Sequence, residues 1–314
     1  MAVRVLDNFL TDPRDCHWDP SALMCTGDAG DAATCMTAPQ VAAMRKYFQG
    51  PINPRTAERI YAGRTRGGES NPLFGSGPTA MTGYLTYWTF GNNFNWLTFD
   101  FDHNMDAIDQ AMAARLNANT ADLEEFKSHG GKLILAHGFA DPAVPTLNTV
   151  DYYERLIASE TREGRHDERE RSEALRRTQE FARLYLLPGA GHCTGGAGPF
   201  TIKDDPFPAG QAHDAISWLA LAPLVQWVEH GIAPDQIIAY HAAGGVTDLS
   251  RPICPYPALP RYRGAGDPTK ASSFVCAANR DHDDNQPPAP KYLDDGDNYP
   301  IVPIDDRDRG HDRR

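Results

Sequence analysis

Long apolar runs and excess positive charge are both missing from this sequence of 314 residues. No apolar run approaches the roughly 20 residues that cross a bilayer, so no membrane partner is expected. Lysine and arginine together number 30 against 42 aspartate and glutamate residues, which gives a formal net charge of −12. A nucleic-acid partner requires a basic face, so the composition argues against one.

An export signal is also lacking, although the cysteines are typical of an exported protein. The first eight residues contain no charged segment followed by an apolar one. Cys25 and Cys35 lie ten residues apart, and Cys254 and Cys276 bracket a loop rich in Pro, Tyr and Arg. Both spacings suit local disulfides, which persist in oxidising compartments and indicate a secreted or periplasmic protein. Together these observations predict a chain that is incomplete or misassigned at its start; the alternative is six reduced thiols in a cytosolic protein.

The order of predicted elements favours an α/β fold in a chain long enough for about two domains. Residues 160–177 carry mixed charges and are expected to form a solvated helix or loop. From residue 279 onward the chain is rich in Asp and Pro and is expected to be a disordered or loosely wrapped tail. The expected helices cover residues 37–48, 106–128 with a break near 117–120, 150–158, and 214–229 with an interruption at Pro223; the expected strands cover 132–136, 182–187 and 236–240.

Residues 84–102 are dense in aromatic and turn-forming residues and are interpreted as a lid over a substrate. Trp88, Phe94 and Trp96 are the predicted substrate contacts. Aromatic rings dominate protein cores generally, so packing is the alternative role for each of these rings.

Two short motifs about fifty residues apart carry the chemistry. Residues 132–145 read as a buried strand followed by a loop that presents Asp141, and residues 186–196 as a strand end followed by a loop that presents His192. Asp before His is the order of the second and third members of an α/β-hydrolase triad, in which the acid orients the imidazole and the imidazole transfers protons. Taken singly, Asp141 could be an ordinary turn residue and His192 a structural loop histidine.

The nucleophile of such a triad is missing from the sequence. It should be a serine in a Gly-x-Ser-x-Gly elbow between a strand and a helix, upstream of both motifs. Ser76 has glycine neighbours but neither a strand before it nor a helix after it, and Ser128 and Ser217 fall within expected helices.

These motifs, with others along the chain, resemble the tannase/feruloyl esterase family, which includes relatives acting on mono-hydroxyethyl terephthalate. The His192-Cys193 dipeptide is a specific part of the resemblance. The resemblance implies a serine carboxylic-ester hydrolase that acts on aromatic acyl esters by a Ser-Asp-His mechanism, with Asp141 as acid and His192 as base. The segments that carry it are residues 11–20, 23–27, 35–41, 130–138, 141–145, 151–153, 188–193 and 224–234.

The same resemblance implies two features that this chain holds only in part. Family members bridge the cysteine beside the catalytic His to a cysteine beside the catalytic Ser, so Cys193 lacks its expected partner, and Cys16 lacks a partner from a calcium loop. No cofactor is implied for catalysis, but a structural calcium is. Of its ligands, the sequence retains positions matching Val5, Asp7 and Phe9, too few for the roughly 6–8 oxygens that calcium takes.

The sequence thus predicts an N-terminally truncated lid domain over residues 1–128 and the C-terminal part of an α/β-hydrolase sheet over 129–254. A disulfide loop over 255–281 and an Asp/Pro-rich tail over 282–314 complete the predicted organisation. The isolated chain is expected to be inactive, because the serine elbow is absent.

Two other classes of function remain open. One is a non-catalytic module that binds aromatic ligands or another protein. The other is a metalloprotein using His137, Asp141, His192 and Cys193, residue types that bind zinc, although their spacing matches no recognised metal pattern.

Overall fold

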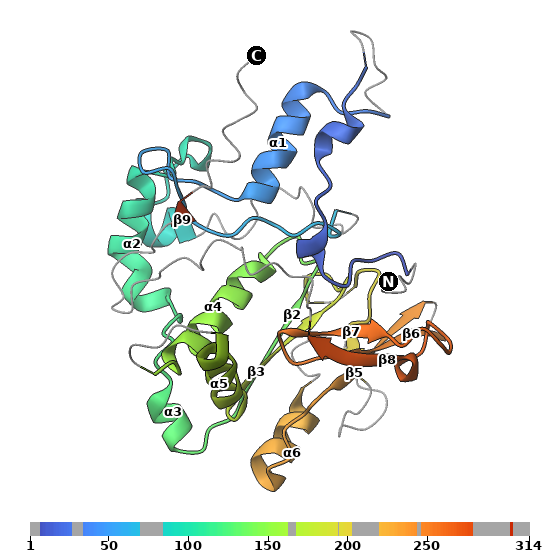
Figure 1. The fold of residues 1–314 in the computed structure, drawn as a ribbon. Helices are drawn as coiled ribbons and strands as arrows, with labels where there is room; N and C mark the ends of the chain where they lie inside the picture. Colours follow the sequence, from blue (N-terminus) through green and yellow to red (C-terminus); the bar gives the residue numbers. More distant parts are fainter. Residues whose placement is uncertain are drawn as a thin grey trace. The chain divides into compact units, whose positions relative to one another are not determined.

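The computed structural model describes residues 7–26, 34–69, 84–162, 168–193, 195–202, 220–243, 246–278 and 302–303 (Figure 1). By their contacts they form two compact units. The first comprises Met1–His17, Thr65–Phe74 and Asp122–Asp283, and the second Trp18–Arg64, Gly75–Ala121 and Asp284–Arg314. The predicted divisions at residues 128, 254 and 281 follow sequence pattern rather than contacts, and they stay predictions.

The structure mixes helices with short strands. The α-helices are α1 (Ala38–Gln49), α2 (His103–Leu116), α3 (Glu124–Ser128), α4 (Thr146–Ser159), α5 (Glu168–Gln179) and α6 (Leu221–His230). The strands are β1 (Glu58–Arg59), β2 (Leu133–Gly138), β3 (Ala182–Leu187), β4 (Thr201–Ile202), β5 (Ile237–Ala243), β6 (Val246–Ile253), β7 (Ala258–Tyr262), β8 (Phe274–Ala278) and β9 (Val302–Pro303). Short 3-10 helices are η1 (Pro13–Asp15), η2 (Pro20–Leu23), η4 (Trp96–Thr98) and η6 (Ala271–Ser273), and η3 (Tyr84–Phe90) is a π-helix.

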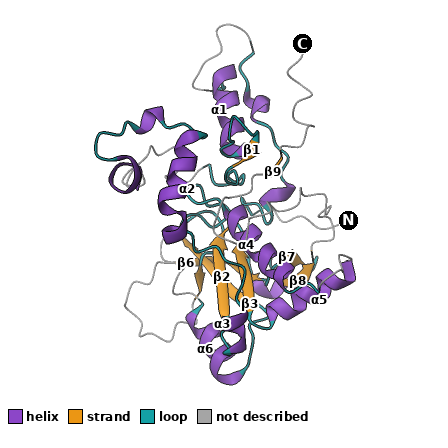
Figure 2. Ribbon diagram, turned by 90° about the vertical axis from the view of Figure 1, so that its left-hand side faces the viewer, coloured by secondary structure: helices purple, strands orange, loops and turns teal. Residues whose placement is uncertain are grey.

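The centre of the first unit is a parallel pair of strands. Strands β2 and β3 pair in register from Leu133 with Ala182 to Gly138 with Leu187. Helix α4 packs against β2 and helix α5 against β3, as Figures 1 and 2 show. The prediction of two parallel strands, each followed by a polar loop, is confirmed.

The two strands differ in burial. Five of the six residues of β3 are fully buried, whereas Leu133, Ile134 and Leu135 of β2 are half-buried and Ala136 is exposed. Strand β3 also bonds on its other side, where the Tyr256 N–H donates to the Leu184 carbonyl at 2.8 Å. Strand β2 is thus less buried than the sequence predicted, and among the described residues no strand pairs with its other edge.

Antiparallel strands follow where the sequence predicted only one last strand and a loop. Strand β5 pairs with β6 from Ile237 with Ile253 to Ala243 with Val246, and β4 adds to its other edge. The predicted disulfide loop contains a two-stranded ladder, β7 with β8. Side chains of Tyr185, Leu187, Ala190, Ile237, Ala239 and Ile253 form a buried cluster that joins these strands to β3.

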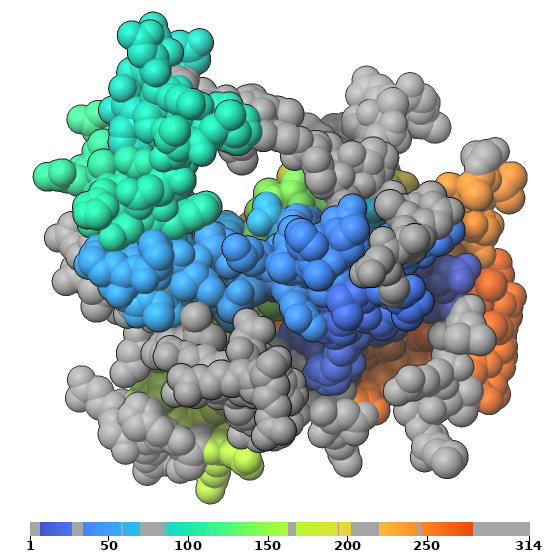
Figure 3. Space-filling view, turned by 90° about the horizontal axis from the view of Figure 1, so that it is seen from above, coloured from blue at the N-terminus to red at the C-terminus, as the bar shows by residue number. Residues whose placement is uncertain are grey.

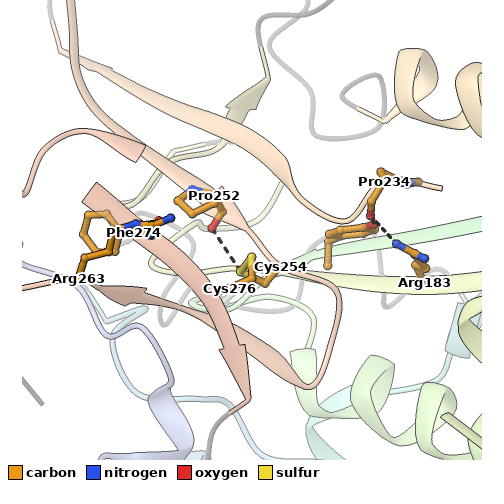
Figure 4. The surroundings of a disulfide bond; sticks show 8 residues. Arg183, Pro234, Pro252, Cys254, Arg263, Phe274 and Cys276 are labelled. Atoms are coloured by element: carbon orange, nitrogen blue, oxygen red, sulfur yellow. Dashed lines mark hydrogen bonds between the residues drawn. A yellow bond between two sulfur atoms is a disulfide. The ribbon is translucent and has the colours of Figure 1, made fainter. Parts of the chain in front are cut away.

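The Cys254–Cys276 disulfide ties the end of β6 to β8 (Figure 4). Close by, Arg251 of β6 is buried, lies 4.0 Å from the centre of the Phe274 ring and donates to the Asp7 carboxylate at 2.8 Å. The disulfide and this ion pair together connect the first described residues of the chain to its C-terminal strands.

Helix α6 covers Leu221–His230 of the helix predicted over residues 214–229. Pro223 lies in its first turn, where the missing N–H costs no hydrogen bond. Gly231 ends the helix with a left-handed φ of 70°. The buried Trp227 ring lies between Lys132 and Arg183, at 5.5 and 5.4 Å, and this anchors α6 near the first residues of β2 and β3 (Figure 2).

The second unit contains α1, which begins after Thr37 as predicted. The Gln40 side chain accepts a hydrogen bond from the Thr37 N–H at 2.7 Å, and the Cys25–Cys35 disulfide closes the loop just before the helix. Arg55 pairs with Asp102 at 2.7 Å and with Asp106 at 3.4 Å. Figure 3 shows this neighbourhood, where the light blue part of the chain adjoins the blue-green residues of α2.

Several predictions lie outside the described residues. These are the tail at residues 279–301 and 304–314, the helical residues 214–219, and the candidates Val5, Ser76 and Ser217. The charged run at 160–177 includes α5, and its Glu170 is buried with an ion pair to Arg177. In the part of the chain that is described, no helix combines the length and apolarity needed to cross a membrane.

Candidate active site

Two loops that follow the central strands lie against each other. The loop after β2 starts at Phe139, whose N–H donates to the Leu187 carbonyl at the end of β3 at 2.8 Å. One residue later the Ala140 N–H donates to the Ala190 carbonyl at 3.0 Å. Carboxyl ends of adjacent parallel strands meet at one edge of a sheet, so their loops face the same crevice.

Gly138 allows this close approach. A Cβ atom at this position would come within 2.4 Å of the Gly191 carbonyl oxygen and 2.5 Å of the Ala190 carbonyl oxygen. Both contacts are with backbone that cannot rotate away. The residue after His137 therefore has to be glycine for the two loops to meet as they do.

Asp141 is a buried carboxylate held in one orientation. Its Oδ1 accepts hydrogen bonds from the N–H groups of Ala143 at 2.7 Å and Val144 at 2.9 Å. This is the turn that an Asp-Pro sequence favours, because the aspartate side chain bonds to backbone two and three residues onward. The turn leaves Oδ2 directed at the histidines.

His192 lies in the second loop and contacts that remaining oxygen. Its Nδ1 is 2.9 Å from Asp141 Oδ2. An ionised carboxylate only accepts hydrogen bonds, so Nδ1 carries the proton and Nε2 is the acceptor nitrogen. The His192 side chain is 34% exposed and that of Asp141 4%, so the imidazole is accessible while the acid behind it is not.

The surroundings of Asp141 keep it ionised. Burial opposes its charge, but hydrogen bonds from His137, the Val144 N–H, His192 and the Ala143 N–H outweigh that effect and lower the pKa of Asp141 from 3.8 to about 2. A permanently negative group behind His192 can orient the imidazole and stabilise its protonated form. The sequence predicted this pairing, and the structure brings the two residues together.

The sequence interpretation overlooked a further part of this cluster. His137 Nε2 lies 3.2 Å from Asp141 Oδ2, and His137 Nδ1 lies 2.7 Å from the Thr149 hydroxyl. His137 entered the sequence analysis only as a possible metal ligand. His137 and Asp141 are four residues apart at the end of a strand, and this spacing could have indicated their contact. Nothing in the sequence indicated that Thr149 of α4 contacts His137.

The described residues contain no group of three or more His, Cys, Asp and Glu side chains arranged to hold a metal ion. His137, Asp141 and His192 are instead connected by hydrogen bonds through one carboxylate oxygen. Their arrangement therefore fits proton chemistry better than metal binding.

The calcium positions fit poorly. Asp7 accepts a charge-assisted hydrogen bond from buried Arg251, so a guanidinium occupies the place beside the carboxylate where a cation would sit. Phe9 lies beside the same arginine, with its ring centre 5.9 Å from the guanidinium carbon. These residues fit an ion pair and not a calcium site, and no step of the chemistry is derived from calcium.

The cysteines divide into two groups. Cys25–Cys35 and Cys254–Cys276 are disulfides, whereas Cys16 and Cys193 are free thiols, the first partly buried and the second exposed. Cys193 follows the candidate base directly and has a left-handed φ of 59°.

The predicted substrate contacts lie in the second unit. Trp88 is 51% and Trp96 40% exposed, and Phe94 stacks on Phe90 with ring centres 4.3 Å apart. Their contact with a substrate stays a prediction.

Comparison with known proteins agrees with the motifs. The family model described as tannase and feruloyl esterase matches residues 4–277. An uncharacterized esterase of Xanthomonas campestris is 35% identical over 307 residues, with 86% of this chain and 51% of the relative covered. The mono(2-hydroxyethyl) terephthalate hydrolase of Piscinibacter sakaiensis is 32% identical over 301 residues, with 82% and 44% covered.

Solved structures agree on the fold. The crystal structure of feruloyl esterase B from Aspergillus oryzae matches with a TM-score of 0.69 at 22% identity, covering 87% of this chain and 53% of that one. The chain spans about half the length of the relatives it matches. The family model matches most of the chain, and the residues at the two loops agree with it. The chain belongs to the tannase and feruloyl esterase family of carboxylic-ester hydrolases.

Proposed function

We propose that this chain supplies the acid and the base of a serine carboxylic-ester hydrolase, with Asp141 as the acid and His192 as the base. The observation that carries the proposal is the 2.9 Å contact between the two side chains, each on a loop that follows one of two adjacent parallel strands. The C-terminal part of an α/β-hydrolase sheet has this arrangement.

The chemistry needs a serine hydroxyl next to His192 Nε2. The serine oxygen attacks the ester carbonyl carbon while Nε2 takes the hydroxyl proton. The ester C–O bond then breaks, and the same proton passes from His192 to the departing alcohol. Water repeats the sequence on the acyl-serine, which releases the acid and restores the serine. Asp141 stabilises the imidazolium in both halves without itself becoming protonated.

The 314 residues contain no Gly-x-Ser-x-Gly elbow, so the proposal includes inactivity of the isolated chain. The nucleophile and the oxyanion-binding N–H groups would come from a further segment of the fold, and we propose that this chain is the C-terminal part of that larger hydrolase.

Aromatic acyl esters are the proposed substrates. The support is the names of two relatives, a terephthalate ester hydrolase and feruloyl esterase B, together with the exposed tryptophans of the second unit. Feruloyl or galloyl esters suit such rings, because aromatic groups stack favourably. The two disulfides support a secreted or periplasmic location.

The test is complementation. The chain would be co-expressed with the part of the Xanthomonas relative that this chain does not match, and hydrolysis of methyl ferulate, methyl gallate and p-nitrophenyl esters would be measured. Activity is expected from the pair and from neither part alone. Asp141→Asn and His192→Ala in the pair should each abolish it. If the isolated chain hydrolyses an ester and His192→Ala removes that activity, the proposed inactivity of the isolated chain is wrong. If the pair stays active with His192→Ala, the proposed role of His192 is wrong.

A non-catalytic aromatic-binding module is the second candidate, favoured by the exposure of Trp88 and Trp96. It predicts saturable quenching of tryptophan fluorescence by methyl ferulate with the isolated chain, reduced in a Trp88→Ala variant. Binding of this kind without activity of the complemented pair would select this alternative.

A further inference from the structure

Two histidines share one carboxylate oxygen in the candidate active site. Asp141 Oδ2 lies 2.9 Å from His192 Nδ1 and 3.2 Å from His137 Nε2. With two backbone N–H groups on Oδ1, the carboxylate has four donors around it. That number matches the lone-pair sites of an ionised carboxylate, so its rotation would break bonds on both oxygens.

The two histidines are not equivalent. His137 has both ring nitrogens occupied, one by Asp141 and one by the Thr149 hydroxyl, and its side chain is only 14% exposed. His192 uses one ring nitrogen for Asp141 and is 34% exposed. A proton shuttle requires an accessible nitrogen, so His137 is unsuited to the role of base.

The two contacts of His137 together indicate which of its ring nitrogens carries the proton. The carboxylate accepts only, so His137 Nε2 has to be the donor. In a neutral imidazole Nδ1 is then an acceptor, and the Thr149 hydroxyl can donate to it at 2.7 Å. Without that donor the ring would lose the contact that favours this tautomer over the other one.

We infer that His137 is a positioning residue that fixes the Asp141 carboxylate toward His192, and that Thr149 acts through His137 by holding its Nε2–H tautomer. The inference rests on the proposed function, since it gives His137 a part in orienting the proposed acid. The chain of contacts runs from helix α4 through Thr149, His137 and Asp141 to His192.

Electrostatics supports the same role. After the opposing effect of burial, the hydrogen bond from His137 is the largest of the interactions that lower the pKa of Asp141. Loss of the His137 contact should therefore raise the pKa of Asp141. It should also leave Oδ2 with His192 as its single side-chain donor.

The first measurement needs no enzyme activity. Two-dimensional NMR of the nitrogen-15-labelled chain reports which ring nitrogen of each histidine is protonated, and the His137→Gln spectrum identifies the His137 signals. A neutral His137 with its proton on Nε2 is expected. A proton on Nδ1, or rapid exchange between the two tautomers, would overturn the inference.

Variants of Thr149 separate positioning from packing. Thr149→Val keeps the shape of the side chain and removes the hydroxyl, whereas Thr149→Ser keeps the hydroxyl and removes a methyl group. The valine variant should shift the His137 tautomer toward Nδ1–H and raise the pKa of Asp141, measured from its side-chain carbon-13 signal. The serine variant should restore both to the parent values. Equal behaviour of the two variants would refute the role of Thr149.

The complemented enzyme gives an independent readout. Thr149→Val should lower kcat about tenfold with KM nearly unchanged, as expected for loss of one weak interaction that matters in the transition state. If the parent pair hydrolyses no ester, the proposed function fails, but the NMR results on the isolated chain still decide whether His137 positions Asp141.

Discussion

The ionised state of Asp141 should make the stability of the chain depend on acid pH. The pKa of Asp141 is lowered from 3.8 to about 2 in the folded chain, so the folded state binds this proton more weakly than the unfolded state. The resulting stabilisation is present above pH 3.8 and is lost as the pH falls toward about 2. The gap between the two values corresponds to about 2 kcal/mol in the free energy of unfolding.

Asp141→Asn isolates this contribution. The amide has nearly the same shape and does not titrate, so the other carboxylates contribute equally to both proteins. Urea unfolding followed by circular dichroism from about pH 5 to about pH 2 would give the free energy of unfolding of each. The asparagine variant is less stable at the upper pH, and the difference between the proteins should shrink by about 2 kcal/mol toward the lower pH.

Two results would refute the reasoning. If the difference in the free energy of unfolding between the two proteins stays constant over this pH range, Asp141 has an ordinary pKa. A difference that grows as the pH falls would mean that burial dominates and that the folded state prefers the protonated acid.

Three further sets of substitutions test the packing of the first unit. Gly138→Ala forces a methyl group against two backbone carbonyls, so it should cost about 1–3 kcal/mol of stability and abolish activity of the complemented pair. An unchanged melting temperature would contradict the close approach of the two loops. Replacing Cys254 and Cys276 by serine opens a loop of 22 residues and should cost about 3 kcal/mol in urea unfolding, whereas no loss would show that the β7–β8 ladder suffices. Arg251→Met should cost about 3–5 kcal/mol because Asp7 keeps a buried unpaired charge, and adding Asp7→Asn should recover part of that loss; a double variant no better than the single one would refute the pairing.

Local sequence pattern predicted much of the first unit. Apolar runs before a polar loop identified β2 and β3, because a strand that packs on a sheet needs such a run whatever surrounds it. The start predicted at residue 37 and the end predicted at residue 229 agree with α1 and α6 to within one residue, because capping by Thr37 and Gly231 depends on a few neighbouring residues.

Longer-range structure was less accessible. Strands β6, β7 and β8 were not predicted, because their stability comes from pairing with one another and from the Cys254–Cys276 bridge rather than from an apolar run of their own. The partial exposure of β2 was not predicted for a related reason, since the neighbours of a strand are not written in its own residues.

The sequence by itself nominated the residues that we propose carry the chemistry: an aspartate and a histidine on loops after two apolar strands, in the order of a hydrolase triad, with no serine elbow to accompany them. Tertiary structure decided how those residues act together. The parallel register of β2 and β3, the contact of Gly138 with the second loop, and the bonds from Thr149 through His137 to Asp141 depend on segments distant in sequence. Hydrogen bonding is directional and short in range, so a pattern along the chain can nominate the partners, but only the folded backbone brings their atoms within reach.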